Sequence, residues 1–213
     1  MYRITLEGTD LAGNTGKKFV MSVVYDDIPP DLELAYPDNN SAVNHLDISY
    51  SISEQLNVGE IVYTRIGGAE DPNSPVSINL EASELETSFD QPQKTAQVPM
   101  LNDGTIYNIQ LFGEDLATNN AKSNVIENVK YDITRPRINI YYPTSNSYFM
   151  GSDINIDISE DLKEGKMVWT RTGGLSDEVT KQKIPLYDQY LKKGAYETHK
   201  IEWAINWSFY TNV

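Results

Sequence analysis

Acidic side chains gather in this sequence where one series of strand-like segments gives way to the next, and their type suits a hard cation. Asp26, Asp27 and Asp31 lie in the run YDDIPPD, and Asp132 occupies the matching place in YDITRP. Calcium takes six to eight oxygen ligands from carboxylates, amide carbonyls and backbone carbonyls. These residues make calcium the best-supported ligand that the sequence suggests.

Two further kinds of acidic residue would join this set if neighbouring loops converged. Asp10 and Asp115 begin the matching loops DLAGN and DLATN, while Glu54 and Glu160 end the matching runs ISE. The predicted metal ligands are Asp26, Asp27, Asp31, Asp115, Glu54 and Asp132.

A second interpretation of the same acids is a solvated acidic surface with aspartates at turns. No D-x-D-x-D-G loop of the EF-hand type is present. The two matching runs, YDDIPPD and YDITRP, are joints between successive series of strands. The second joint carries Thr134 and Arg135 where the first is more acidic. Both interpretations remain open at the level of sequence.

Catalytic residues are not expected. His45 and His199 lie in segments that do not correspond to each other, and neither a G-x-S-x-G nor an H-E-x-x-H motif accompanies them. There are no cysteines, which excludes thiol catalysis, disulfides and cysteine-bound metals. We predict no enzyme, no catalytic or cofactor-binding residue and no required cofactor.

The charge balance disfavours two classes of partner. With 17 basic and 31 acidic residues, the formal net charge is −14. Such a surface repels phosphate backbones and anionic lipid headgroups, so nucleic acid is not an expected partner. No apolar run approaches the roughly 20 residues that a membrane span needs, so membrane insertion is not expected either.

The elements that must position these acids are strands, and they repeat. YDDIPPDLELAYP from Tyr25 matches YDITRPRINIYYP from Tyr131, a spacing of 106 residues (131 − 25). YRITLEGTDLAGN from Tyr2 matches YNIQLFGEDLATN from Tyr107 at 105 residues (107 − 2), so that hairpin has gained or lost one residue. A repeat of this length corresponds to a complete domain.

The phase of the repeat predicts three segments. Residues 1–27 are the last two strands of a preceding repeat, 28–133 form a complete domain, and 134–213 form a domain lacking its last two strands. One interpretation is a fragment of a long array with ragged ends. In the other, residues 2–27 are donor strands that complete the last domain of the same chain or of the next molecule, by head-to-tail strand exchange.

Seven antiparallel strands are predicted in the complete repeat, near 31–36, 46–52, 60–66, 76–82, 94–99, 106–114 and 123–131. Apolar residues alternate with polar ones in LDISYSIS and IYNIQLFG, which is typical of strands with one buried face. Tyr107 follows Gly104 as in a tyrosine corner, whose hydroxyl bonds to backbone upstream. Tyr63 and Trp169 are expected in the core.

The DLAGN hairpin, the YD-x-x-x-P joint and ISE-x-L-x-x-G-x-x-V-[YW]-TR-x-GG resemble bacterial Ig-like repeats of long secreted or cell-surface proteins. The resemblance covers nearly the whole chain and is weakest after Gly174. It implies an all-β fold of tandem immunoglobulin-like β-sandwiches in contact with neighbouring repeats of the same chain. Pro29, Pro30 and Pro136 at the joints favour a semi-rigid rod.

The resemblance also implies a function: a non-catalytic structural or adhesive segment, extracellular or on the cell surface, that spaces or displays binding regions. Its ligand would be a cell-surface protein or a glycan. The alternative is an accessory carbohydrate-binding module, suggested by aromatic residues near Tyr141 and Tyr148 and around Trp203 and Trp207. Alternation in IEWAINW equally suits a core-facing strand.

Overall fold

The computed structural model describes residues 1–88, 93–95, 99–148, 154–174 and 181–198. Within these ranges the chain forms strands and two short 3-10 segments, η1 (Ala82–Glu84) and η2 (Asp188–Leu191), with no α-helix. The protein is therefore all-β, as the sequence predicts. No helix in the described part is long and apolar enough to cross a membrane. Backbone contacts divide the chain into two units, between Thr134 and Arg135.

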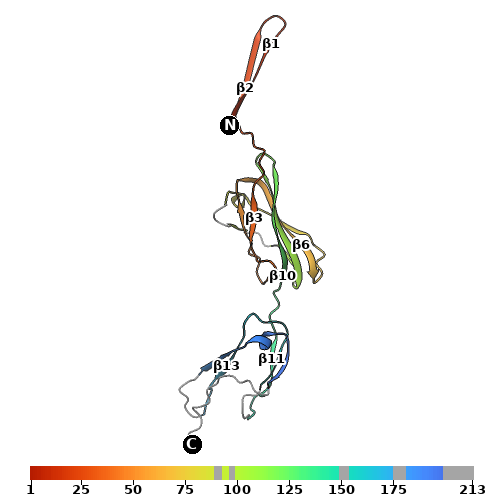
Figure 1. The fold of residues 1–213 in the computed structure, drawn as a ribbon, viewed down its shortest axis with the longest axis vertical. Helices are drawn as coiled ribbons and strands as arrows, with labels where there is room; N and C mark the ends of the chain where they lie inside the picture. Colours follow the sequence, from red (N-terminus) through yellow and green to blue (C-terminus); the bar gives the residue numbers. More distant parts are fainter. Residues whose placement is uncertain (89–92, 96–98, 149–153, 175–180, 199–213) are drawn as a thin grey trace. The chain divides into compact units, whose positions relative to one another are not determined.

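The larger sheet of the first unit has five strands (Figure 1). In spatial order they are β4 (Ala42–Val43), β10 (Asn120–Tyr131), β9 (Thr105–Asp115), β6 (Leu56–Gly68) and β7 (Val76–Asn79). All pairs are antiparallel except the short pairing of β4 with β10, which is parallel. This exception was not predicted, because two residues are too few to show an alternating pattern.

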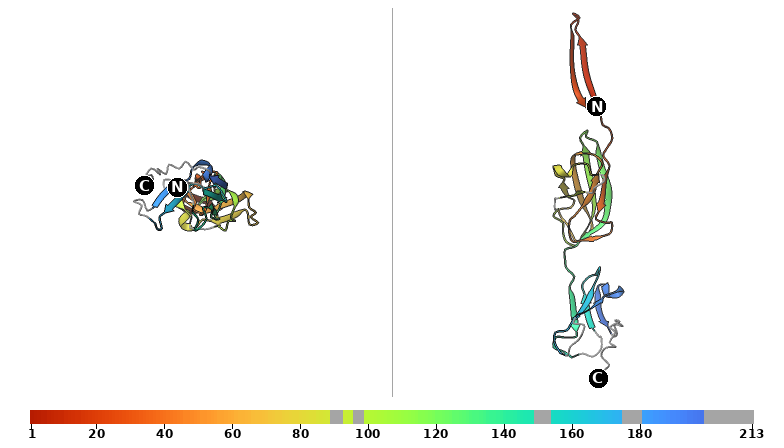
Figure 2. Two further views of the ribbon diagram at one scale, coloured as in Figure 1. Left: turned by 90° about the horizontal axis from the view of Figure 1, so that it is seen from below. Right: turned by 90° about the vertical axis from the view of Figure 1, so that its left-hand side faces the viewer.

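A second sheet of three strands contributes to the same core. It contains β3 (Leu32–Tyr36), β5 (Ser49–Ile52) and β8 (Gln93–Lys94). Figures 1 and 2 show both sheets of this unit in orange to green. Buried Leu34 and Tyr50 from one sheet belong to the same hydrophobic cluster as Ile61, Tyr107 and other residues of the other sheet. Six of the seven strands expected from the sequence correspond to β3, β5, β6, β7, β9 and β10. The expected strand near 94–99 overlaps β8 at Lys94, and residues 96–98 of it lie outside the described residues.

Alternation along β9 explains which of its residues are buried. Every second side chain from Thr105 to Asp115 is buried, and those between them are half-exposed. A strand places successive side chains on opposite faces, so Asp115 lies at the end of the same row as Tyr107 and Leu111. The predicted core position of Tyr63 is confirmed: its ring is fully buried and meets the Tyr107 ring edge-on at 6.4 Å.

The second unit contains two small sheets in the described residues. One has β11 (Ile138–Tyr142), β12 (Ile154–Ile158) and β15 (Gly194–Thr198), and the other has β13 (Lys166–Thr170) and β14 (Lys181–Pro185). Its core holds buried Ile154, Ile156 and Ile158, with Trp169 packed partly buried against them. The pairing of Ile138 with Ile158 in β11–β12 matches that of Leu32 with Ile52 in β3–β5, at a spacing of 106 (138 − 32; 158 − 52).

The first strands of the chain form a hairpin, β1 (Tyr2–Thr9) with β2 (Thr15–Val23). Its pairs Tyr2–Val23 and Ile4–Val20 match Tyr107–Val129 and Ile109–Ile126 of β9–β10. The strand β10 has an extra residue in a bulge between Lys122 and Val125, whereas the pairing of β1 with β2 runs unbroken from Ile4 to Thr9. This bulge explains why matching residues lie 105 positions apart between β1 and β9 but 106 positions apart between β2 and β10 beyond the bulge.

Candidate metal centre

Asp115 is held by its own hairpin loop, between β9 and β10. Its Oδ1 accepts hydrogen bonds from the backbone N–H of Ala117 (2.7 Å) and Asn119 (2.9 Å), and its Oδ2 accepts one from Asn119 Nδ2 (2.8 Å). Asp10 makes the same contacts with Ala12 and Asn14. Both aspartates therefore bond to the backbone of their own turns, as aspartate in tight loops commonly does.

The environment of Asp115 favours its charged form. Its side chain is 1% exposed, and burial acts to raise the pKa. The hydrogen bonds from Asn119 and Ala117 to the carboxylate outweigh this effect and hold the pKa of Asp115 below its ordinary value. Asp115 is thus a preformed, rigid anion at the end of the core-facing row of β9.

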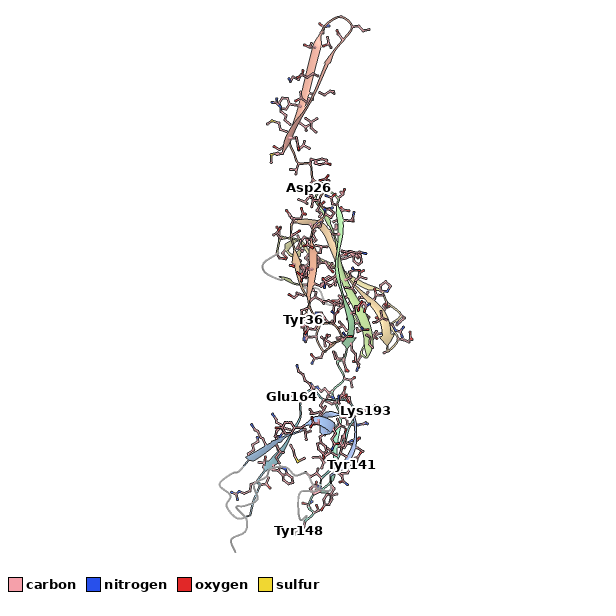
Figure 3. The ribbon with its side chains drawn as sticks, in the orientation of Figure 1. Asp26, Tyr36, Tyr141, Tyr148, Glu164 and Lys193 are labelled. Carbon is pink, nitrogen blue, oxygen red and sulfur yellow. The ribbon has the colours of Figure 1, made fainter. Side chains whose placement is uncertain are left out.

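Asp26 lies in the segment between β2 and β3 and is labelled in Figure 3. Its Oδ1 accepts a hydrogen bond from the backbone N–H of Ile28 at 3.1 Å. Asn119 Nδ2 donates to the backbone oxygens of Asp26 (3.3 Å) and Ile28 (3.5 Å). The side-chain amide of Asn119, which is hydrogen-bonded to Asp115, therefore also binds the first joint and holds Asp26 near the hairpin loop.

Glu54 completes a cluster of three carboxylates. It follows β5, and one carboxylate oxygen from each of Asp26, Glu54 and Asp115 lies within 4.8 Å of the other two. Loss of hydration first, and then the negative charges of Asp26 and Asp115, raise the pKa of Glu54 above its ordinary value. No ion pair between described residues involves these three side chains.

The donor set fits a hard divalent cation. Three carboxylates supply up to six oxygen atoms, and waters or backbone carbonyls can complete the coordination of calcium. Like charges this close disfavour ionisation of Glu54, and a bound cation would remove that penalty.

The other three predicted ligands lie outside this cluster. Asp27 is exposed and accepts a hydrogen bond from the Tyr25 hydroxyl at 3.0 Å. Asp31 is exposed, and its backbone N–H donates to Ser53 Oγ. Asp132 forms an ion pair with Lys130, with 2.6 Å between Nζ and Oδ2.

Asn119 is a site residue that the sequence pattern did not lead us to predict, although a signal for it is present. The loops DLAGN and DLATN both end in asparagine, at Asn14 and Asn119. That shared residue makes the same side-chain contact with the aspartate four positions before it in both loops. What the repetition does not reveal is the second role of Asn119, its contact with the joint.

The aromatic residues proposed as a glycan platform are only partly described. Tyr141 and Tyr148, labelled in Figure 3, are exposed. Trp203, Trp207, Phe209 and Tyr210 lie outside the described residues, as does Phe149. Glycan binding stays a prediction.

Changing the pH should reveal the free-energy cost of ionising Glu54 in the folded protein. A carboxyl group whose pKa is raised by folding destabilises the fold at pH values above that pKa, where it is ionised. Glu54→Gln should therefore raise the melting temperature at pH 7 in EDTA, and the gain should vanish near pH 4. The contribution of Asp115 to stability depends on pH in the opposite way, since it is lost as the pH falls. Because Asp115 is present in both proteins, its contribution cancels when they are compared.

Thermal melts of the two proteins at pH 7 and pH 4 provide the measurement. Glu33→Gln, which replaces an exposed glutamate of β3, is the control and should change the melting temperature little at either pH. A gain for Glu54→Gln that is equally large at both pH values would contradict an electrostatic origin.

Neither a scan against protein-family models nor a search of curated proteins returns a match for this chain.

Proposed function

We propose that this chain is a non-catalytic segment of a tandem array of immunoglobulin-like β-sandwiches, extracellular or on the cell surface, that spaces or displays binding regions. A calcium ion at Asp26, Glu54 and Asp115 would fix the first joint. The convergence of these three carboxylates from the joint and two loops of the following domain is the observation that carries the proposal.

The tandem arrangement is supported by hydrogen bonds that recur 106 residues apart. Ser53 and Asp31 exchange two such bonds, through Ser53 Oγ and through the backbone oxygen of Asp31. Ser159 and Arg137 exchange the same two (159 − 53; 137 − 31). The backbone bond from Leu56 to Leu85 likewise recurs from Leu162 to Leu191. Two segments that share strand register and loop contacts are expected to be copies of one domain type.

The sandwich assignment is supported by the core and by one corner of the first unit. Two sheets contribute to a single hydrophobic cluster, as in packed sheets. The Tyr107 hydroxyl accepts a hydrogen bond from the backbone N–H of Asn102 at 3.0 Å, which is the contact expected of a tyrosine corner. These contacts agree with the resemblance to bacterial Ig-like repeats.

A spacer must hold its joints, and the first joint has two means of doing so. Asn119 contacts two backbone oxygens of the joint directly. A cation bound to Asp26, Glu54 and Asp115 would bind the joint and both loops together. Extracellular calcium modules have dissociation constants of about 0.1–1 mM, which suits a site with three carboxylates.

Thermal melts in calcium and in EDTA test the proposal. At ten times its dissociation constant, a cation that binds only the folded state adds about 1.4 kcal/mol of stability, or about 5 °C in melting temperature. We expect this rise in millimolar calcium and not in sodium at matched ionic strength. Asp26→Asn and Glu54→Gln should each abolish most of it.

Asp27→Asn is the matched control, because Asp27 lies in the same joint but outside the cluster. It should keep the full response to calcium. Superimposable melts of the wild type in calcium and EDTA would remove the ion from the proposal. Equal losses in Asp26→Asn and Asp27→Asn would indicate a diffuse effect of surface charge in place of a site.

A further inference from the structure

A hollow lies on the outer face of the five-stranded sheet, where β10, β9, β6 and β7 run side by side. Its volume is about 270 Å³, close to the lower end of the range of about 300–1,000 Å³ for ligand pockets. A hollow of this size accommodates the end of one long side chain or one small molecule. The side chains that decide its chemistry are Val58, Glu60, Asn79, Phe112, Glu114 and Asn120.

Alternation along the strands places Phe112 and Glu60 on this outer face. Their neighbours Leu111 and Ile61 are fully buried in the core, and successive side chains of a strand point to opposite faces. Phe112 pairs with Glu60 of β6 on one side and with Lys122 of β10 on the other. The hollow therefore belongs to the solvent side of the sheet and is no gap in the packing of the core.

The glycines beside the hollow are explained by the fold. Gly59 pairs with Gly113, and a methyl group at these positions would lie 2.9 Å and 2.8 Å from the nearest leucine methyl groups of the core. Both glycines recur in the repeat, as Gly165 (165 − 59 = 106) and Gly8 (113 − 8 = 105). Close packing of the core beneath the strands accounts for them.

The aromatic and acidic residues of the hollow are not explained in this way. Lys166 occupies the place of Glu60 in the second unit, and Glu7 occupies the place of Phe112 in the hairpin β1–β2. The matching strands β13 and β1 form their pairs with these different residues. Strand pairing therefore requires neither the Phe112 ring nor the Glu60 carboxylate, which leaves both available for binding.

The charged groups at the hollow are mainly negative. Among the described residues the Glu60 side chain makes no hydrogen bond or ion pair, and Glu114 accepts one hydrogen bond, from Asn57 Nδ2 at 3.1 Å. Lys122, opposite Phe112, forms no ion pair with any described residue. The hollow thus combines an aromatic ring with two carboxylates whose charge no described basic side chain neutralises by direct contact.

We propose that this hollow binds a cationic side chain of a partner protein, an arginine or a lysine, with Phe112 beneath the cation and Glu60 and Glu114 as its counter-ions. The face of an aromatic ring attracts a cation electrostatically. Carboxylates add charge-assisted hydrogen bonds, which the planar guanidinium group of arginine forms best. Asn79 and Asn120 offer amide groups to the backbone of the bound segment.

A neutral sugar is the alternative ligand for an aromatic hollow, and charge distinguishes the two. A sugar ring would stack on Phe112, but it would leave the negative charges of Glu60 and Glu114 uncompensated. The formal net charge of −14 also attracts basic partners at long range. The inference goes beyond the proposed function, because the hollow lies within one unit and depends on neither the tandem array nor the candidate metal centre.

NMR titration of the ¹⁵N-labelled full chain tests the inference, in EDTA and at low ionic strength. The probe is a blocked glycine–arginine–glycine tripeptide, and its matched control carries citrulline, which has the shape of arginine without its charge. The arginine peptide should shift the amide resonances of Gly59, Phe112 and Gly113. The citrulline peptide should bind at least about fivefold more weakly.

Four variants locate the binding site. Glu60→Gln and Phe112→Leu should each weaken binding of the arginine peptide about threefold. Lys122→Gln should strengthen it about twofold, because it removes a positive charge beside Phe112. Glu127→Gln is the matched control: it removes the same charge as Glu60→Gln from an exposed position of β10 outside the hollow, and should bind like the wild type.

Glu60, Lys122 and Glu127 are at least partly exposed, so their variants should melt like the wild type. The inference would be overturned by an arginine peptide that causes no shifts, by equal binding of the citrulline peptide, or by weaker binding in Lys122→Gln. Larger shifts of the same resonances with cellobiose would assign the hollow to a glycan instead. None of these results alters the calcium melts, which test the proposed function separately.

Discussion

Replacing Gly68 with alanine is expected to destabilise the first unit by about 3 kcal/mol. Gly68 has a φ of +69°, which disfavours any side chain, and a Cβ there would lie 2.3 Å from the backbone oxygen of Gly104. It would also lie 3.1 Å from the backbone nitrogen of Ile106. Because β6 and β9 are paired at this point, the strands would have to separate to make room.

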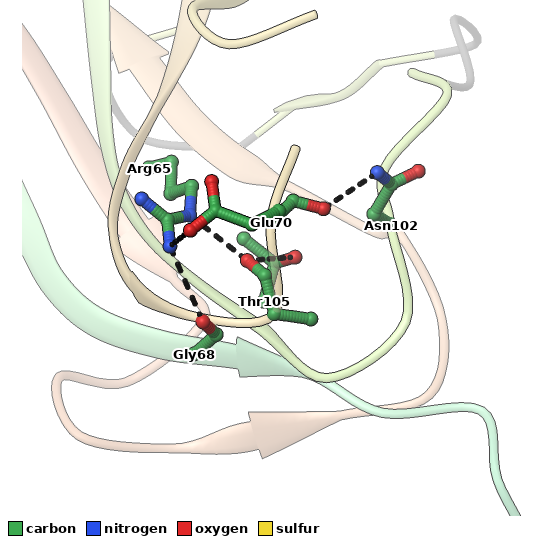
Figure 4. A network of polar contacts seen from close by, with 6 residues as sticks. Arg65, Gly68, Glu70, Asn102 and Thr105 are labelled. Carbon is green, nitrogen blue, oxygen red and sulfur yellow. Dashed lines mark hydrogen bonds and ion pairs between the residues drawn. The ribbon is translucent and has the colours of Figure 1, made fainter. Parts of the chain in front are cut away.

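The loop after Gly68 cannot easily move to relieve the clash (Figure 4). Arg65 donates to the backbone oxygens of Gly68 (3.3 Å) and Ala69 (2.8 Å) and pairs with Glu70 at 2.8 Å. Asn102 donates to the backbone oxygen of Glu70 at 3.0 Å. Shifting the backbone at Gly68 would disturb these contacts together.

Urea unfolding at 25 °C measures the effect, and two other glycines serve as controls. Gly67→Ala should cost little, since its nearest contact would be Ile106 Cδ1 at 3.9 Å. Gly174→Ala combines a φ of +87° with open space around the Cβ position, so about 1 kcal/mol is expected. A cost for Gly68→Ala no larger than that for Gly67→Ala would contradict the steric argument.

Tyr107→Phe is expected to cost about 2 kcal/mol, because it breaks a buried hydrogen-bond relay. The Tyr107 hydroxyl donates to Asp71 Oδ2 at 2.6 Å and accepts from the backbone N–H of Asn102 at 3.0 Å. Asp71 is buried, so phenylalanine would leave one of its carboxylate oxygens without this partner. Burial and then the bond to Asp71 raise the pKa of Tyr107, as expected for a neutral donor to a carboxylate.

Tyr63→Phe provides the matched comparison within the same aromatic pair. The Tyr63 hydroxyl is buried and has no hydrogen-bond partner among the described residues. Removing a buried hydroxyl that lacks a partner should be neutral or slightly stabilising. Equal free energies of unfolding for the two variants would show that the relay through Asp71 contributes nothing beyond packing.

Local chemistry made several features predictable from sequence. Alternation in IYNIQLFG predicts the buried row of Tyr107, Ile109 and Leu111, because a strand places every second side chain on one face. The loops DLAGN and DLATN predict aspartates that bind their own turn backbone, because the side chain reaches the N–H groups two and four residues ahead. Each of these features depends on residues close together in the chain.

The candidate site was predictable only in part. Six acids were predicted as ligands on the premise that loops converge, and the structure brings three of them together. Asp132 forms an ion pair with Lys130, two positions before it. At the first joint the residue that corresponds to Lys130 is Val24, which cannot form an ion pair with Asp26. The choice among the acids depended on neighbours that the repeat does not share.

The sequence by itself determined the longer strands and their alternation, the turns and the spacing of 106 residues, because periodicity and turn chemistry act over a few residues. Only the tertiary structure decided that Asp26, Glu54 and Asp115 meet and that Asp71 receives the Tyr107 hydroxyl. It also decided that Ile138 and Ile140 remain exposed where Leu32 and Leu34 are covered. These outcomes depend on which distant segments pack against one another, and similar local sequences have different neighbours in the two units.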